Sequence, residues 1–129
     1  MKKTLFILLT IIFSSVAFAQ TTEKTAVFSF AEKAFDFGDV KEGAMVSHTF
    51  TYKNTGNDTL RIDNIVSSCG CTVVNSYQKT VAPGKSSSIT IDFNSAGKMG
   101  VINKTVTILS NAKSEEPAEF LKIRVNVLN

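Results

Sequence analysis

The feature that most constrains this chain is a two-residue alternation of apolar and polar side chains, repeated in short runs. The clearest run spans residues 46–53. One parity holds Val46, His48, Phe50 and Tyr52, and the other holds Ser47, Thr49, Thr51 and Lys53. Successive side chains of a strand point to opposite faces, so this run predicts a strand with one buried face and one solvated face. On that parity His48 is a core or edge histidine with its hydrogen bonds satisfied, rather than a metal ligand.

Similar runs recur along the chain and are separated by turn sequences. They cover residues 26–30, 35–40, 60–63, 65–73, 89–93, 105–108 and 121–127, with turns at 41–43, 54–58, 82–85, 94–100 and 111–117. Parity slips near Asp63 and Asn64, which predicts a bulge or strand break there, and Gly38 predicts a second bulge. Seven or so short strands with this spacing predict an all-β, antiparallel β-sandwich.

The first 19 residues have the pattern of a cleaved signal peptide. Lys2 and Lys3 precede an apolar run from Leu5 to Phe13, and Ala17-Phe18-Ala19 gives the small-residue pattern that a signal peptidase cleaves. The apolar run is shorter than the roughly 20 residues of a membrane span. We therefore expect a signal peptide over residues 1–19 and one domain over residues 20–129, with its core at about 26–128. The expected location is outside the cytoplasm, in a periplasm or the extracellular space, with no membrane attachment after cleavage.

Charge gives no sign of a polyanionic partner. The chain has 14 Lys+Arg and 11 Asp+Glu, and removing Lys2 and Lys3 leaves 12 against 11, a net charge of +1. No Lys/Arg cluster remains as a nucleic-acid footprint. Asp36 and Asp39 lie in a turn-like segment typical of backbone capping, and the serine runs have no histidine placed to activate them. We expect no nucleic-acid binding, no cofactor and no enzymatic activity.

Both cysteines lie in one motif, Cys69-Gly70-Cys71. In an extended strand their Cα atoms would be about 6.6 Å apart, at the upper limit for a disulfide, although Gly70 could relieve this by adopting a conformation closed to other residues. A bridge that closes so short a loop stabilises by only about 1.6 kcal/mol. A structural zinc site needs four ligands, and two cysteines with His48 fall short.

Three interpretations of the cysteine pair remain open. Cys69 and Cys71 can be packing residues, with Gly70 allowing close approach. They can form a labile disulfide or dithiol that exchanges with partners. Alternatively, their two thiolates can bind a soft metal such as Cu(I).

An ordered series of motifs resembles a known bacterial family, the domain of unknown function 1573. The motifs are Phe35–Gly43, His48-Thr49-Phe50, Asn54-Thr55-Gly56, Ser68-Cys69-Gly70-Cys71-Thr72 and Ala82-Pro83-Gly84, within a match from about Phe28 to Val127. One departure is that residues 73–77 keep a tyrosine but lack the prolines that often follow the Cys-Gly-Cys-Thr motif. The resemblance implies an exported immunoglobulin-like β-sandwich, similar to ASH and major-sperm-protein domains, and it implies no activity.

These observations together predict an exported immunoglobulin-like binding or structural module. A protein partner would bind through an exposed sheet edge, where backbone groups are unpaired. The alternative function is a thiol-redox or Cu(I) site at Cys69 and Cys71.

Overall fold

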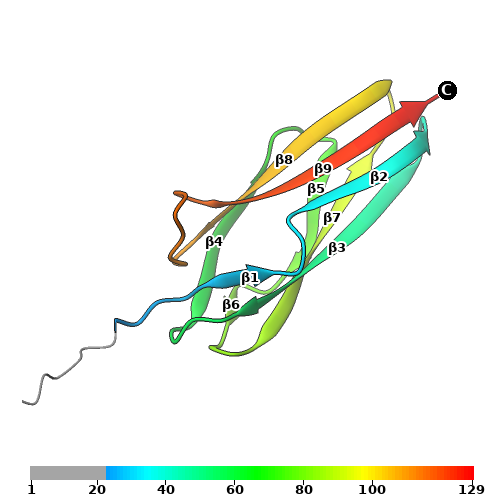
Figure 1. The fold of residues 1–129 in the computed structure, drawn as a ribbon. Coiled ribbons are helices and arrows are strands. Elements are labelled where there is room, and N and C mark those ends of the chain that lie inside the picture. Colours follow the sequence, from blue (N-terminus) through cyan, green and yellow to red (C-terminus); the bar gives the residue numbers. More distant parts are fainter. Residues whose placement is uncertain (1–22) are drawn as a thin grey trace, which may run out of the picture.

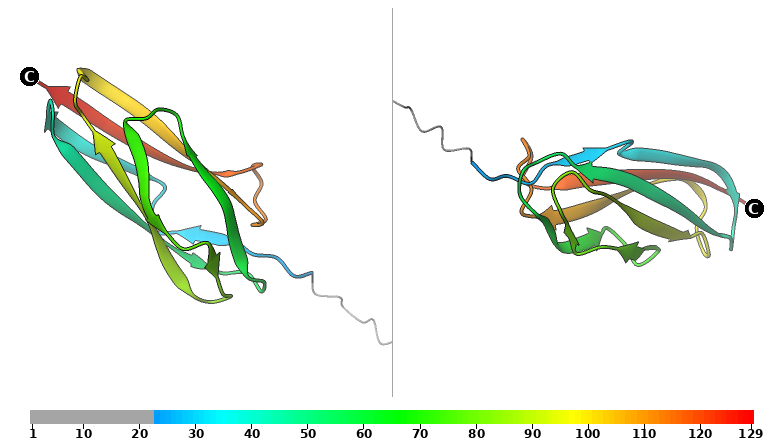
Figure 2. Two further views of the ribbon diagram at one scale, coloured as in Figure 1. Left: turned by 180° about the vertical axis from the view of Figure 1, so that it is seen from behind. Right: turned by 90° about the horizontal axis from the view of Figure 1, so that it is seen from below.

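The computed structural model describes residues 23–129, so the predicted signal peptide lies outside the described residues. Two β-sheets pack against each other, as Figures 1 and 2 show. The first sheet has the order β1-β3-β7-β5, and the second has the order β2-β9-β8-β4-β6. The strands are β1 (Phe28–Phe30), β2 (Ala34–Lys41), β3 (Met45–Asn54), β4 (Leu60–Ser67), β5 (Thr72–Tyr77), β6 (Thr80–Val81), β7 (Ser86–Asn94), β8 (Gly100–Ser110) and β9 (Glu119–Leu128). The predicted all-β sandwich is confirmed.

All strand pairs are antiparallel except β2 with β9, which run parallel. The exception arises because β1 and β2 form one path that changes sheet at residues 31–33. Before the change, the Ala31 amide donates to the Thr51 carbonyl in the first sheet (3.1 Å). After it, the Lys122 amide donates to the Lys33 carbonyl in the second sheet (2.8 Å). The alternation pattern alone did not indicate this parallel pair.

The core lies between the sheets and consists of the side chains that the alternation pattern places inward. Its fully buried members include Phe50, Ile89, Ile91 and Phe93 from the first sheet and Leu60, Val106, Ile108, Leu121, Ile123 and Val125 from the second. Burying one such side chain contributes roughly 1.5–3 kcal/mol. The strand pattern read from the sequence therefore reflects the main source of stability in the sandwich.

Both predicted bulges are present. The register of β2 against β9 shifts between Asp36 and Asp39, where Gly38 has a φ of 71°. The amide of Gly38 donates to Asp36 Oδ1 (2.8 Å), and this bond, together with Arg124, lowers the pKa of the Asp36 carboxyl. The register of β4 against β8 shifts between Ile62 and Asn64.

A buried asparagine organises the end of the sandwich where the described chain begins. The side chain of Asn54 accepts hydrogen bonds from the amides of Val27 (3.2 Å) and Gly56 (3.1 Å). It donates to the carbonyls of Asp58 (2.8 Å) and Val81 (3.0 Å). Asn54 is completely buried, so its four bonds join the segment before β1, the β3–β4 turn and β6 without leaving a polar atom unsatisfied.

Candidate functional site

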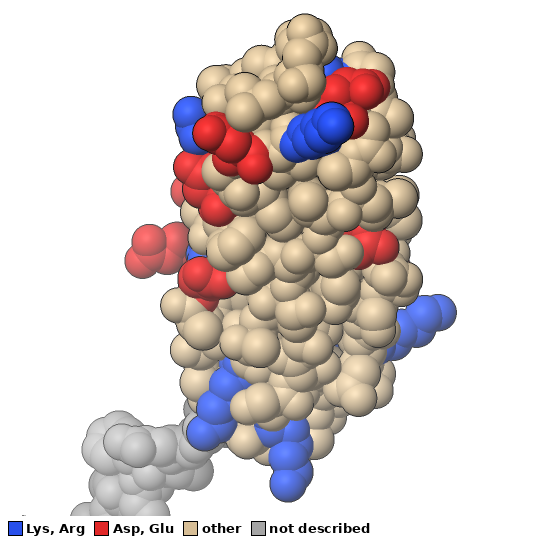
Figure 3. All heavy atoms as spheres, turned by 90° about the vertical axis from the view of Figure 1, so that its right-hand side faces the viewer, with Lys and Arg blue, Asp and Glu red and all other residues tan. Residues whose placement is uncertain are grey.

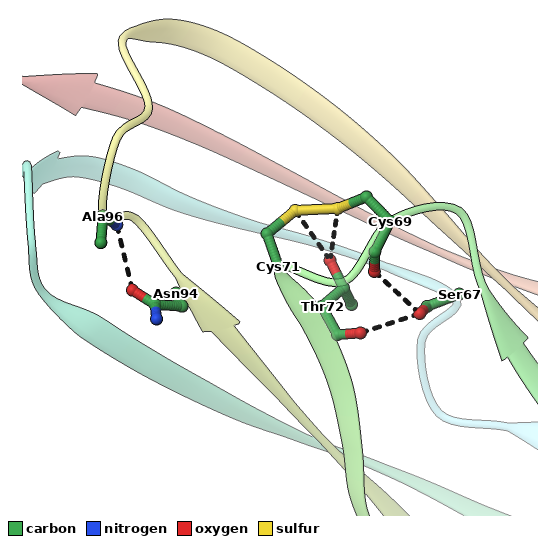
Figure 4. The surroundings of a disulfide bond; sticks show 6 residues. All are labelled: Ser67, Cys69, Cys71, Thr72, Asn94 and Ala96. Atoms are coloured by element: carbon green, nitrogen blue, oxygen red, sulfur yellow. Dashed lines mark hydrogen bonds between the residues drawn. A yellow bond between two sulfur atoms is a disulfide. The ribbon is translucent and has the colours of Figure 1, made fainter.

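The Cys-Gly-Cys motif lies in the turn between β4 and β5, where the chain passes from the second sheet to the first (Figure 4). The turn has its own hydrogen bonds. The Ser67 hydroxyl donates to the carbonyls of Cys69 (3.0 Å) and Thr72 (2.8 Å), and the Asn94 amide donates to the Cys71 carbonyl (2.8 Å). The motif is therefore not part of the extended strand predicted over residues 65–73. That strand is divided into β4 and β5.

Cys69 and Cys71 form a disulfide across this turn, with their Cα atoms 5.4 Å apart. Both residues are partly exposed, and Cys71 also packs against the rim of the core. The Thr72 hydroxyl lies 3.9 Å from one sulfur and 4.0 Å from the other. The bridge is thus accessible at the surface yet connected to the core through its second cysteine.

Two sequence-based expectations about this motif are wrong. Gly70 does not adopt the left-handed region, so the bridge does not depend on a backbone conformation that only glycine takes readily. A Cβ atom at Gly70 would meet no atom within 4 Å, so the glycine does not serve a close approach either. Val73 does not share an inward face with the cysteines. It is 55% exposed, whereas Thr72 is buried, because the turn resets the alternation at the start of β5.

His48 lies at the unpaired edge of β3, which agrees with the prediction of a core or edge histidine, and one of its ring nitrogens has a hydrogen-bond partner. Its ring stacks on Phe35 with centroids 3.5 Å apart, and Nε2 lies 2.5 Å from Glu32 Oε1. The neighbouring Lys33 forms an ion pair with the largely buried Glu119 of β9 (2.6 Å). Glu32 and Lys33 therefore bind the crossing segment between β1 and β2 to both sheets.

Other surface features lie apart from the disulfide. A hollow over the outer side of the second sheet is lined by residues that include Asp36, Asn103, Lys122 and Arg124, and the Asp36–Arg124 ion pair (2.9 Å) lies within it. On the face drawn in Figure 3, acidic and basic side chains mix at the upper end, lysine and arginine side chains lie at the lower end, and most of the surface between is uncharged. That face carries no continuous basic patch.

Within residues 23–129, the described part of the chain, neither a metal-binding cluster nor a membrane-spanning helix occurs. No group of three or more His, Cys, Asp or Glu side chains that could hold a metal ion occurs there. The same residues contain no helix with the length and apolar character needed to cross a membrane.

An unpaired edge of β8 lies beside the disulfide turn. Ser67, the last residue of β4, is opposite Val106, so β4 covers β8 only from Val106 onward. The stretch from Gly100 to Thr105 pairs with β9 on one side, and no described strand pairs with its other side. Figure 1 shows β8 and β9 extending beyond the turn at which β4 ends. The sequence prediction missed this stretch as strand, because Lys104 interrupts the apolar parity.

Comparison with protein families decides the classification. The model of the family described as "Protein of unknown function (DUF1573)" matches residues 28–127. The chain belongs to this family. The resemblance inferred from the ordered motifs is confirmed. A search of curated proteins found no match.

Solved structures show the same fold at low sequence identity. A protein of unknown function from Porphyromonas gingivalis W83 is 18% identical, with a TM-score of 0.70 over 84% of this chain and 50% of that one. The ASH/PapD-like domain 7 of human CEP192 is 9% identical, with a TM-score of 0.67 over 86% of this chain and 92% of that one. The Vibrio cholerae VesB protease is 19% identical, with a TM-score of 0.63 over 77% of this chain and 31% of that one. The chain spans half or less of the first and third of these. The immunoglobulin-like fold is confirmed, and these similarities extend to the fold alone.

Proposed function

We propose that this protein is an exported binding module that recognises an extended segment of a protein partner at a free sheet edge, without catalysing a reaction. The observation that carries the proposal is the open construction of both sheets. The sandwich does not close into a barrel, so edge backbone N–H and C=O groups remain available to an added strand. Strand addition supplies affinity through main-chain hydrogen bonds and needs no deep pocket.

Site-specific photo-cross-linking in cells that produce the protein tests this proposal. A photoreactive residue replaces Val101 on β8 or Ser76 on β5, and replaces Lys122 on the central strand β9 as the control. We expect discrete cross-linked products from the edge positions and none from the control. Equal products from all three positions would contradict edge recognition, as would no product from either edge.

Export is tested separately by cell fractionation and by determining the N-terminus of the mature protein. We expect the protein outside the cytoplasm with Gln20 as its first residue. A mature chain that retains residues 1–19 would refute the cleavage prediction.

A second candidate function is thiol–disulfide exchange at Cys69 and Cys71. Its support is that the bridge is partly exposed and closes a loop with a single intervening residue. A partner thiolate would attack one sulfur, the other would leave as a thiolate, and a second partner thiol would then release an oxidised partner and the reduced motif. Cu(I) binding would require this reduction first, because bridged sulfurs are not thiolates.

Equilibration in glutathione buffers of graded potential, followed by thiol trapping and intact mass, tests this candidate. A functional exchange site is expected to have a reduction potential well above about −300 mV, whereas structural disulfides typically have potentials below that value. A bridge that resists reduction until the protein unfolds would rule out both exchange and Cu(I) binding. Adding Cu(I) to the reduced protein and measuring its intact mass then distinguishes Cu(I) binding from exchange alone, because a bound copper ion increases the mass.

A further inference from the structure

We propose that the unpaired edge of β8 from Gly100 to Thr105 binds an extended segment carrying an acidic side chain, and that Lys104 selects for that side chain. This inference rests on the proposed function, because it names the edge and the partner chemistry. The occupant is a polypeptide strand with an Asp or Glu on the parity that faces the inside of the sandwich and an apolar residue on the other parity.

The length and regularity of this edge suit strand addition. The six residues from Gly100 to Thr105 span roughly 20 Å, about the length of a common strand. Their register against β9 continues without a shift from Gly100 to Ile108. Other edges are less suitable: β1 and β6 are only three and two residues long, and the ladders of β2 and β5 each contain a register shift. Bulges and short strands are common devices that protect edges from pairing.

One further stretch, Met45–Phe50 of β3, is also regular and unpaired on one side, because β1 covers only Tyr52 to Asn54. Its inward polar residue, His48, already has a partner in Glu32 and a stacking surface in Phe35. The β8 edge differs because its inward polar residue, Lys104, has no ion-pair partner among residues 23–129.

Lys104 lies opposite the buried Ile123 and therefore shares the inner face of the sheet with it. Among residues 23–129, no hydrogen bond or ion pair involves the Lys104 ammonium group. A lysine in this position covers apolar surface with its stem and carries its charge toward water at the open edge. An inward-facing charge on an edge strand also opposes pairing with a second copy of the chain, because the Lys104 ammonium groups of both copies would then lie on the inner face of one joined sheet and repel each other.

An incoming strand would take water away from Lys104, and an unpaired charge removed from water is costly. A carboxylate on the incoming strand removes that cost, so the lysine favours an acidic segment over a neutral or basic one. The outer face of the same edge has a different character. Val101 is 55% exposed there, and a strand that continues the line of β4 would place a side chain against it. Lys104 thus favours an acidic side chain on the inward-facing parity of the bound segment, and Val101 favours an apolar side chain on its outward-facing parity.

Phage-displayed peptides of ten random residues provide the test. The library is selected against the wild-type protein and against Lys104→Glu, with Lys122→Glu as the matched control on the outer face of β9. We expect wild type and K122E to enrich peptides that alternate apolar residues with Asp or Glu. The K104E variant is expected to lose these peptides and to enrich basic ones. The best wild-type peptide should bind K104E about 10-fold to 100-fold more weakly.

A Lys104→Met variant guards against misfolding, because it keeps the length of the stem and removes only the charge. It should bind the acidic peptide more weakly than wild type while retaining the wild-type urea midpoint or exceeding it. Enrichment that is the same for wild type and K104E would overturn the role of Lys104.

Amide hydrogen exchange with the best peptide bound locates the edge. Protection within Gly100–Thr105 supports the proposal. Protection within Met45–Phe50 or on β5 would overturn the β8 assignment and leave edge recognition standing. Enrichment of no peptide by any variant would overturn both the assignment and edge recognition of short peptides.

Discussion

Reducing the Cys69–Cys71 disulfide is expected to lower the free energy of unfolding by no more than about 1.6 kcal/mol. The value follows from the closed loop, which contains only three residues, so the bridge removes little entropy from the unfolded chain. Reduction is a cleaner perturbation than substitution, because it keeps both sulfur atoms and the contact of Cys71 with the core. The turn also retains the hydrogen bonds from Ser67 and Asn94.

Urea unfolding with and without a phosphine reductant measures this effect. With a typical dependence of about 1–3 kcal/mol per molar urea for a small domain, the midpoint should fall by roughly 0.5–1.5 M at most, with no change in slope. Intact mass at each point verifies the redox state. A matched variant, Gly70→Ala, should leave the free energy of unfolding of the oxidised protein within about 0.5 kcal/mol of wild type, since its Cβ meets open space.

A loss of more than 3 kcal/mol on reduction would refute this reasoning, because loop entropy could not account for it. The bridge would then hold together packing that the free cysteines cannot maintain. A changed slope would likewise show that reduction alters the compactness of the folded or unfolded state rather than the loop alone.

Three further predictions concern the buried polar groups and the close backbone contact of the first sheet. Asn54→Leu should lower stability by about 4 kcal/mol in urea unfolding, since four hydrogen bonds of about 1 kcal/mol each are lost. Gly56→Ala should cost about 1–3 kcal/mol and increase amide exchange at Val27, because its Cβ would lie 2.1 Å from the Thr25 carbonyl oxygen. Tyr52→Phe should stabilise by about 1 kcal/mol, because the buried Tyr52 hydroxyl has no hydrogen-bond partner among residues 23–129, and the Ser87 hydroxyl opposite it donates to Gln78 Oε1 instead. Burial raises the pKa of Tyr52, so wild type should lose stability as pH rises above about 10, and Y52F should flatten that decline in pH-dependent melting.

The sequence predicted the faces of the strands well, because facing depends on local parity. Phe50 and Tyr52 in β3, and Leu121 and Ile123 in β9, are buried as their alternation indicates. The bulge near Asp63 was predictable for the same reason, since a slip of parity has to be absorbed by an extra residue. Family membership was also within reach, because the ordered motifs extend over most of the chain.

Strand partners were not predictable in the same way. The parallel pairing of β2 with β9 joins residues more than 80 positions apart, such as Ala34 and Lys122, and no local pattern encodes that choice. The turn at the cysteines was missed for a local reason. Ser68-Cys69-Gly70-Cys71 contains one glycine and no Pro, Asn or Asp, so it lacks most of the residues that mark turns, and its odd-numbered apolar residues imitate a strand.

The position of that turn explains why β8 has an open edge. In the register of β4 against β8, Ser67 lies opposite Val106 and Val66 opposite Thr107. A continuous strand through Val73, as the parity predicted, would therefore have covered β8 as far as Gly100. The turn removes this cover from the six residues that begin β8. A strand extended through Cys69 and Cys71 would separate their Cα atoms by about 6.6 Å, whereas the bridge holds them 5.4 Å apart. The Cα separation at the bridge therefore agrees with the turn rather than with an extended strand. The same turn ends β4 at Ser67 and leaves Lys104 at an unpaired edge, so the disulfide and the open edge share one structural origin.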